Sequence, residues 1–372
     1  MARSLCLAFG LCCLAFLAAA QEAPEQILRQ AIAKHQSGDV EGAISEYRAY
    51  LKLRPDSPDV RSNLGAALAR TGRYAEAIVE YQAALKAGAR DPRIRMNLAL
   101  AYYKEGEIAD AARELAAVHA ADPNNQQAIL VLADCWLRQG ENIKVIQLLT
   151  PFDRQDPGNL AVAYMLGMAL LRNKQVQQGQ QIIDRIMHNG NTPEVHLLLG
   201  MAKLEAMEYP AAIADLKKAV ELNPNLPDLY SYLGEAEMSS GDMQAAREAF
   251  EKEIQHNPND FESNLRLAVL LKQDGDYDRA QQLLARALRV RPGSMAALYQ
   301  VGAVQLAAGD LAHACATLEK VVKQSPDFLE AHVSLAQGYY RMKRKEDGDR
   351  ERAIVQKLKA AQDKKQERGE AH

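Results

Sequence analysis

The sequence lacks the short motifs that mark most catalytic and cofactor sites. It has no Gly-rich phosphate loop, no His-Glu-x-x-His, no Cys-x-x-Cys and no Gly-x-Ser-x-Gly. The eight histidines are scattered, and His196 and His332 are read as packing residues and not as metal ligands. Asp134 and Glu235 are read as solvated or paired carboxylates. We therefore expect no enzyme activity, no cofactor and no metal site.

An excess of charge of either sign is also missing. The 45 Lys and Arg residues nearly balance the 48 Asp and Glu residues, which gives a net charge of −3. Nucleic-acid binding usually requires a basic stripe, so we expect no nucleic-acid partner. No Asn-x-Ser/Thr sequence is present, so N-glycosylation is not expected. No strand pattern is visible either.

Only one long apolar run is present, and it lies at the N-terminus. Arg3 is the only charge among the first twenty residues, and the run 5–20 ends in three alanines before Gln21. This pattern is typical of a secretory signal peptide over residues 1–20, which predicts export to the periplasm or the medium. The run is short for a membrane span of about 20 residues. An uncleaved anchor and a lipid-modified cysteine are the alternatives, although Cys12 and Cys13 lack small residues before them.

The rest of the chain has a period of 34 residues. Prolines recur at this interval, at Pro224, Pro258, Pro292 and Pro326, and windows of this length start at 24, 58, 92, 126, 160, 193, 227, 261, 295 and 329. The eighth residue of each window is Gly or Ala in all ten, the fifteenth is Gly in seven, and the twentieth is Ala in seven. The twenty-fourth is large and apolar in nine.

These places describe a helical hairpin. Small residues at the eighth and twentieth places let two helices cross closely. Glycine at the fifteenth place can adopt a positive φ and end the first helix, and a following Asp, as at Asp242, can cap the second. In the window that starts at 227 we expect helices over 228–239 and 243–255. One hairpin cannot bury its apolar faces alone and needs a neighbour on each side.

The pattern resembles the tetratricopeptide repeat family. The resemblance covers residues 24–361 and implies an all-α, right-handed superhelical solenoid of about ten helix-turn-helix repeats, within a mature region 21–361. A charged tail over 362–372 is expected to be disordered. Cys135 and Cys315 lie five repeats apart, tens of Å in such a stack, so no internal disulfide is expected.

The windows that start at 160, 193 and 329 depart from the pattern. Lys174, Met207 and Lys343 stand where glycine is usual, and the window at 160 is one residue short. We expect a looser joint near 174–193 and a polar cap at the end of the array.

The resemblance also implies that first helices line the concave side, with the second, fifth, ninth and twelfth residues of each window facing inward. In the middle repeats these residues are apolar, and we call them the inner stripe: Met96, Leu100, Tyr103, Leu130, Leu137, Tyr164, Met168, Leu171, Leu197, Met201 and Leu204. So many apolar side chains left in water would exceed what most monomers expose. Either they form a groove for an apolar or amphipathic partner segment, or a tight superhelix packs them against one another.

These observations favour a non-enzymatic scaffold that binds a protein or peptide. The alternative is an accessory subunit of an envelope enzyme or of a polysaccharide or protein export complex. Self-association through the concave face or the end cap is a third possibility.

Overall fold

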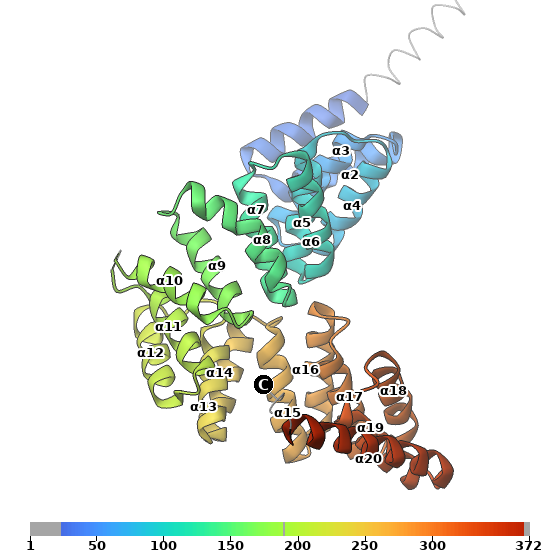
Figure 1. Cartoon of the computed structure of the whole chain (residues 1–372). Coiled ribbons are helices and arrows are strands. Elements are labelled where there is room, and N and C mark those ends of the chain that lie inside the picture. Colours follow the sequence, from blue (N-terminus) through green and yellow to red (C-terminus); the bar gives the residue numbers. More distant parts are fainter. Residues whose placement is uncertain (1–23, 189, 368–372) are drawn as a thin grey trace, which may run out of the picture. The chain divides into compact units, whose positions relative to one another are not determined.

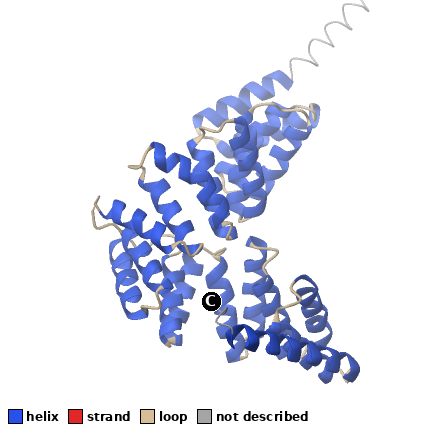
Figure 2. Cartoon of the chain, viewed as in Figure 1, coloured by secondary structure: helices blue, strands red, loops and turns tan. Residues whose placement is uncertain are grey.

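The computed structural model describes residues 24–188 and 190–367. The predicted signal peptide and the last five residues of the predicted tail lie outside this part. Every regular element within the described residues is a helix, and none is a strand (Figures 1 and 2). The protein is an all-α helical repeat solenoid, as the sequence predicted.

The helices alternate between first and second members of hairpins. Residues 24–37 form the first helix of the first hairpin. The other first helices are α3 (Pro58–Arg70), α5 (Pro92–Glu105), α7 (Gln126–Gln139), α9 (Leu160–Arg172), α11 (Pro193–Glu205), α13 (Leu229–Ser240), α15 (Phe261–Asp274), α17 (Met295–Ala308) and α19 (Leu329–Arg341). The second helices are α2 (Val40–Leu53), α4 (Tyr74–Lys86), α6 (Ile108–Ala121), α8 (Asn142–Gln155), α10 (Val176–Met187), α12 (Tyr209–Leu222), α14 (Met243–His256), α16 (Tyr277–Val290), α18 (Leu311–Gln324) and α20 (Lys345–Glu367).

The small eighth residue and the large twenty-fourth residue of one window meet in the hairpins that contain Gly65, Gly200, Gly234 and Gly302. A Cβ atom added to Gly234 of α13 would lie 2.7 Å from the ring of Phe250 on α14, which is fully buried. At Gly200 the same added atom would lie 2.5 Å from Leu216. Real Cβ atoms do not approach so closely, so glycine at the eighth place is required where the partner side chain lies directly over the helix.

The fifteenth residue is left-handed in all ten windows, whether or not it is glycine. Lys174, Met207 and Lys343 have φ values of 61°, 59° and 62°, and the seven glycines at this place have positive φ values as well. A non-glycine residue in this region costs about 1–2 kcal/mol. The backbone path at this place is therefore imposed by the packing of the two helices, and three repeats bear the strain.

Replacing Met207 with glycine is expected to raise the melting temperature. The Met207 side chain is 72% exposed, so its removal costs little packing, while the left-handed strain is relieved. Part of the gain is offset by the greater entropy of glycine in the unfolded chain. The free energy of unfolding should therefore rise by about 0.5–1 kcal/mol and the melting temperature by about 2 °C. Circular dichroism melting of the variant checks this. Met207→Ala is the control, because it shortens the side chain but keeps the strain; equal melting temperatures for the two variants would contradict the explanation.

Contacts divide the chain into two compact units. Unit 1 ends at Cys135 and unit 2 begins at Trp136, so the boundary lies within α7. Inside each unit a first helix packs on its own second helix, and that second helix packs on the next first helix, as α11, α12 and α13 do. First helices of successive hairpins also touch, as α9 and α11 do. Cys135 and Cys315 are both buried, and no disulfide joins them.

The last helix, α20, differs from the other second helices. It runs to Glu367 and so continues into the segment that the sequence assigned to a disordered tail. Gly348 occupies the twentieth place of the last window, and a Cβ atom added to it would lie 2.6 Å from the ring of Tyr340. Ile354 and Leu358 are half-buried, while most of the other described side chains of this helix are exposed. This distribution agrees with the polar cap that was expected at the end of the array.

Candidate functional site

The inner stripe divides into two groups by burial. Five members are buried: Leu137, Met168, Leu171, Leu197 and Met201. Six are half-buried: Met96, Leu100, Tyr103, Leu130, Tyr164 and Leu204. The buried group lies on α7, α9 and α11, of which α9 and α11 pack directly on one another, and these five side chains are covered by the chain itself. Whether the half-buried group binds a partner stays a prediction.

In unit 1 the half-buried residues lie on α5 and α7. The Tyr103 hydroxyl donates a hydrogen bond to Asp134 Oδ2 at 2.6 Å, which accounts for the one carboxylate that interrupts the stripe. Met96 also lines a cavity of about 660 Å³ between the ends of α4 and α6 and the starts of α5 and α7. Unit 1 therefore has accessible apolar side chains next to a cavity.

The histidines at the fourth place have structural partners. His196 Nδ1 lies 3.0 Å from Asp215 Oδ1, and His332 Nδ1 lies 2.5 Å from Glu351 Oε2, so each His meets an acid 19 residues further along its own hairpin. Arg95 and Glu114 form the same kind of pair at 2.6 Å. Within the described residues no group of three or more His, Cys, Asp or Glu side chains could hold a metal ion.

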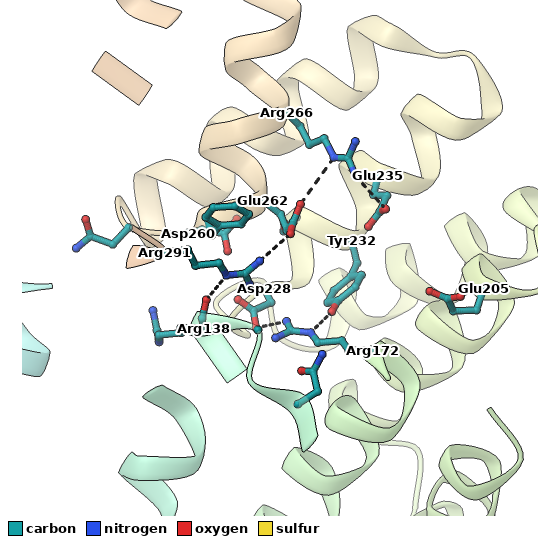
Figure 3. A pocket seen from close by; sticks show the side chains of 15 residues that line it. Arg138, Arg172, Glu205, Asp228, Tyr232, Glu235, Asp260, Glu262, Arg266 and Arg291 are labelled. Carbon is teal, nitrogen blue, oxygen red and sulfur yellow. Dashed lines mark hydrogen bonds and ion pairs between the residues drawn. The ribbon is translucent and has the colours of Figure 1, made fainter. Parts of the chain in front are cut away.

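Unit 2 contains a charged cavity of about 300 Å³ that the sequence analysis did not identify (Figure 3). It lies among the C-terminal ends of α7, α9 and α11, the start and middle of α13, the start of α15 and the residue that follows α16. Four arginines and five carboxylates line it: Arg138, Arg172, Arg266, Arg291, Glu205, Asp228, Glu235, Asp260 and Glu262.

Arg172 joins three of these elements. Its Nε donates to the Tyr232 hydroxyl on α13, its Nη1 donates to the Leu137 carbonyl at 3.1 Å, and its Nη2 pairs with Asp228 Oδ2 at 3.1 Å. Arg341 donates in the same way to the Leu306 carbonyl at 2.6 Å, one window apart. In these two windows the thirteenth residue thus caps the end of the preceding first helix, where the carbonyl groups have no helical partner.

Arg291 makes a second contact with the end of α7, from the far side of the cavity. Its Nε donates to the Arg138 carbonyl at 2.6 Å, and its Nη1 donates to Glu262 at 3.1 Å. The guanidinium also stacks on the Phe261 ring, 3.9 Å from the ring centre. Residues 153 positions apart are joined in this way, and burial lowers the pKa of Arg291.

Next to the cavity lies Glu253, the most deeply buried carboxylate of the described residues. Glu253 is 1% exposed and accepts hydrogen bonds from the backbone N–H groups of Asp228 and Tyr230 at 3.2 and 3.1 Å. Burial, together with the negative charges of Asp260 and Asp228, raises the pKa of Glu253 to about 8. Burial and Asp228 also raise the pKa of Asp260. Asp228 itself has a positive φ of 64°, a strained conformation of the kind found at functional sites.

One signal in the sequence could have pointed to this cavity. The thirteenth residue is basic in four successive windows, namely Arg70, Lys104, Arg138 and Arg172. A recurring cation at one place of a repeat indicates a recurring partner. Among the carboxylates only Asp228 and Glu262 share a place, the second of successive windows, whereas Glu205, Glu235 and Asp260 occupy the thirteenth, ninth and thirty-fourth places.

Sequence models of tetratricopeptide repeats match most of the chain. Four such models match residues 28–92, 102–151, 208–238, 237–303 and 296–327, about two thirds of the sequence. The chain belongs to the tetratricopeptide repeat family. Proteins of this family bind protein partners and are generally non-catalytic scaffolds. No curated protein matches the sequence.

A solved structure of a tetratricopeptide repeat protein has the same fold. A tetratricopeptide repeat protein from Parabacteroides merdae is 16% identical, covers 66% of this chain and 98% of its own, and superimposes with a TM-score of 0.55. A crystal structure of MamA is 21% identical over 45% of this chain and 97% of its own, with a TM-score of 0.41. No described helix of the present protein combines the length and apolar character that a membrane crossing requires.

Proposed function

We propose that this tetratricopeptide repeat protein is an exported scaffold that binds an apolar or amphipathic segment of a protein partner along the first helices of unit 1. The observation that carries the proposal is the half-buried apolar side chains of α5 and α7, namely Met96, Leu100, Tyr103 and Leu130. These residues retain accessible surface, whereas most of the inner stripe in unit 2 is buried. The mechanism is equilibrium binding on an extended surface.

Export rests on the N-terminal sequence. Arg3 followed by the apolar run 5–20 and by Gln21 is the pattern of a cleaved signal, so the proposed location is the periplasm or the medium. Retention of the run as a membrane anchor is the competing possibility. The mass of the protein recovered from the exported fraction separates them, since cleavage leaves Gln21 as the first residue.

A capture experiment tests the binding surface. The double variant Leu100→Glu/Leu130→Glu places two charges on the inner stripe of unit 1, and we expect it to retain at least about tenfold less partner from an extract of the exported fraction than the mature chain does. The matched control is Val79→Glu/Ile143→Glu, which adds two charges at side chains that are 60% and 59% exposed on second helices. Equal capture by all three folded proteins would refute binding on this surface.

A further inference from the structure

Asp260 is a buried carboxylate that lines the charged cavity without an ion-pair partner. It is 9% exposed, and its Oδ1 accepts a hydrogen bond from the Ser263 N–H at 2.7 Å. Among the described residues no Lys, Arg or His side chain forms an ion pair with it, although four arginines line the same cavity. A buried charge is normally paired, because burial without a partner is costly. Through this hydrogen bond Asp260 caps the N-terminus of α15. The charges of Arg172 and Arg291 act on it from a distance, but no cation of the described residues contacts its carboxylate, so the cavity leaves a position for one.

The carboxylates nearer the opening are also weakly held. Among the described residues Glu235 makes no hydrogen bond, and its one ion contact is with Arg266 at 3.8 Å. Glu262 is shared between Arg291 at 3.1 Å and Arg266 at 3.8 Å (Figure 3). Two of the four arginines, Arg172 and Arg291, donate to backbone carbonyls of α7 as well as to carboxylates. Because five carboxylates face four arginines, the ionised side chains that line the cavity carry a net negative charge.

We propose that the cavity seats the guanidinium group of an arginine side chain carried by the protein partner, with Asp260, Glu235 and Glu262 as its counter-charges. A volume of about 300 Å³ is at the small end of ligand pockets and suits one side chain, not a helix. Arginine fits better than lysine because its planar fork of donors can serve several carboxylates at once and is more easily desolvated. The inference rests on the proposed scaffold function in one respect, that a protein carries the cation.

The probe is a capped tripeptide with a central arginine, measured by calorimetry against the full mature chain. We expect it to bind about tenfold more tightly than the same peptide with citrulline, which keeps the shape but lacks the charge, and to weaken as salt is added. A lysine peptide is expected to bind more weakly than arginine. The proposal is overturned if the arginine peptide does not bind or binds no more tightly than the citrulline peptide. It is also overturned if an aspartate peptide, which would pair with Arg266, binds more tightly than the arginine peptide.

Two variants locate the site. Glu235→Gln removes a charge that holds no hydrogen bond, and Asp260→Asn keeps an acceptor for the Ser263 N–H. Both are expected to reduce arginine-peptide affinity about tenfold while the chain stays folded. The matched control is Glu330→Gln, which changes an exposed carboxylate at the same repeat place as Glu262 and should leave the affinity unchanged. An effect of the control equal to that of Glu235→Gln would refute the location.

The outcome separates this proposal from the scaffold function. Arginine-peptide binding in a protein that captures no partner would support the cavity and remove the scaffold proposal. Partner capture that is lost in Leu100→Glu/Leu130→Glu, without any arginine-peptide binding, would support the scaffold and remove the cavity proposal.

Discussion

Replacing Arg172 with methionine is expected to lower the free energy of unfolding of unit 2 by about 3–5 kcal/mol. The side chain holds the Tyr232 hydroxyl, the Leu137 carbonyl and Asp228 together, and its removal leaves a half-buried carboxylate and a helix-end carbonyl without partners. The melting temperature measured by circular dichroism should fall by about 10 °C. Adding Asp228→Asn to the variant should restore part of the loss, because the stranded charge is then absent.

Arg341 provides the control for this prediction. It donates to the Leu306 carbonyl as Arg172 donates to Leu137, but it forms no ion pair with the described residues. Arg341→Met should therefore cost only about 1 kcal/mol, the net value of one hydrogen bond. Equal losses for the two variants would show that the ion pair with Asp228 contributes nothing to stability.

Replacing Glu253 with glutamine is expected to change how stability depends on pH. The pKa of about 8 in the folded chain exceeds the ordinary value of 4.5, so the folded state binds more protons than the unfolded state between these limits. The stability that protonated Glu253 contributes is complete below about pH 4.5 and is lost as the pH rises through 8. Over this window the wild-type protein should lose on the order of 2–4 kcal/mol.

Glutamine is neutral at every pH, but its single amide oxygen can accept from only one of the N–H groups of Asp228 and Tyr230, which donate to different oxygens of Glu253. The variant should therefore melt somewhat lower than the wild type near pH 5 and should lose less stability than the wild type between pH 5 and pH 8.5. Glu251→Gln, two residues away on α14 with a loose 3.6 Å ion pair to Arg279, should leave the pH profile as it is. A wild-type melting temperature that does not fall between these pH values would contradict the assignment.

The helical hairpins could be predicted from the sequence because their determinants lie within one period. Gly234 and Phe250 are 16 residues apart and meet in the same hairpin, as Gly200 and Leu216 do, and so do Gly65 with Tyr81 and Gly302 with Leu318. A small eighth residue that recurs in all ten windows is visible without any knowledge of distant contacts. The expected helices of this window, 228–239 and 243–255, differ from α13 and α14 by only one residue at an end.

The burial of the inner stripe could not be predicted in the same way. Met168 and Met201 occupy the ninth place of their windows, as Leu100 does, yet they are 2% and 3% exposed, while Leu100 is half-buried. The difference depends on how closely successive first helices pack. That distance is set jointly by many side chains, and no single window contains the information.

The charged cavity was missed for a related reason. Arg172 is the thirteenth residue of one window, Asp228 the second of another, and Arg291 the thirty-first of a third. Each one alone is typical of an ordinary surface charge. Only the fold brings them together, and it does so through backbone carbonyls of α7 that a sequence pattern does not display.

The left-handed residue between the two helices of each hairpin has a consequence for counting repeats. The stretches that the family models leave unmatched, 152–207 and the residues after 327, contain Lys174, Met207 and Lys343. Those are the windows where the turn persists without its glycine. A search that scores residue types overlooks these windows. A search for a positive φ at the fifteenth place would find every repeat. Divergent arrays of this kind therefore contain more repeats than their sequence profiles indicate, and the backbone torsion counts these repeats more completely.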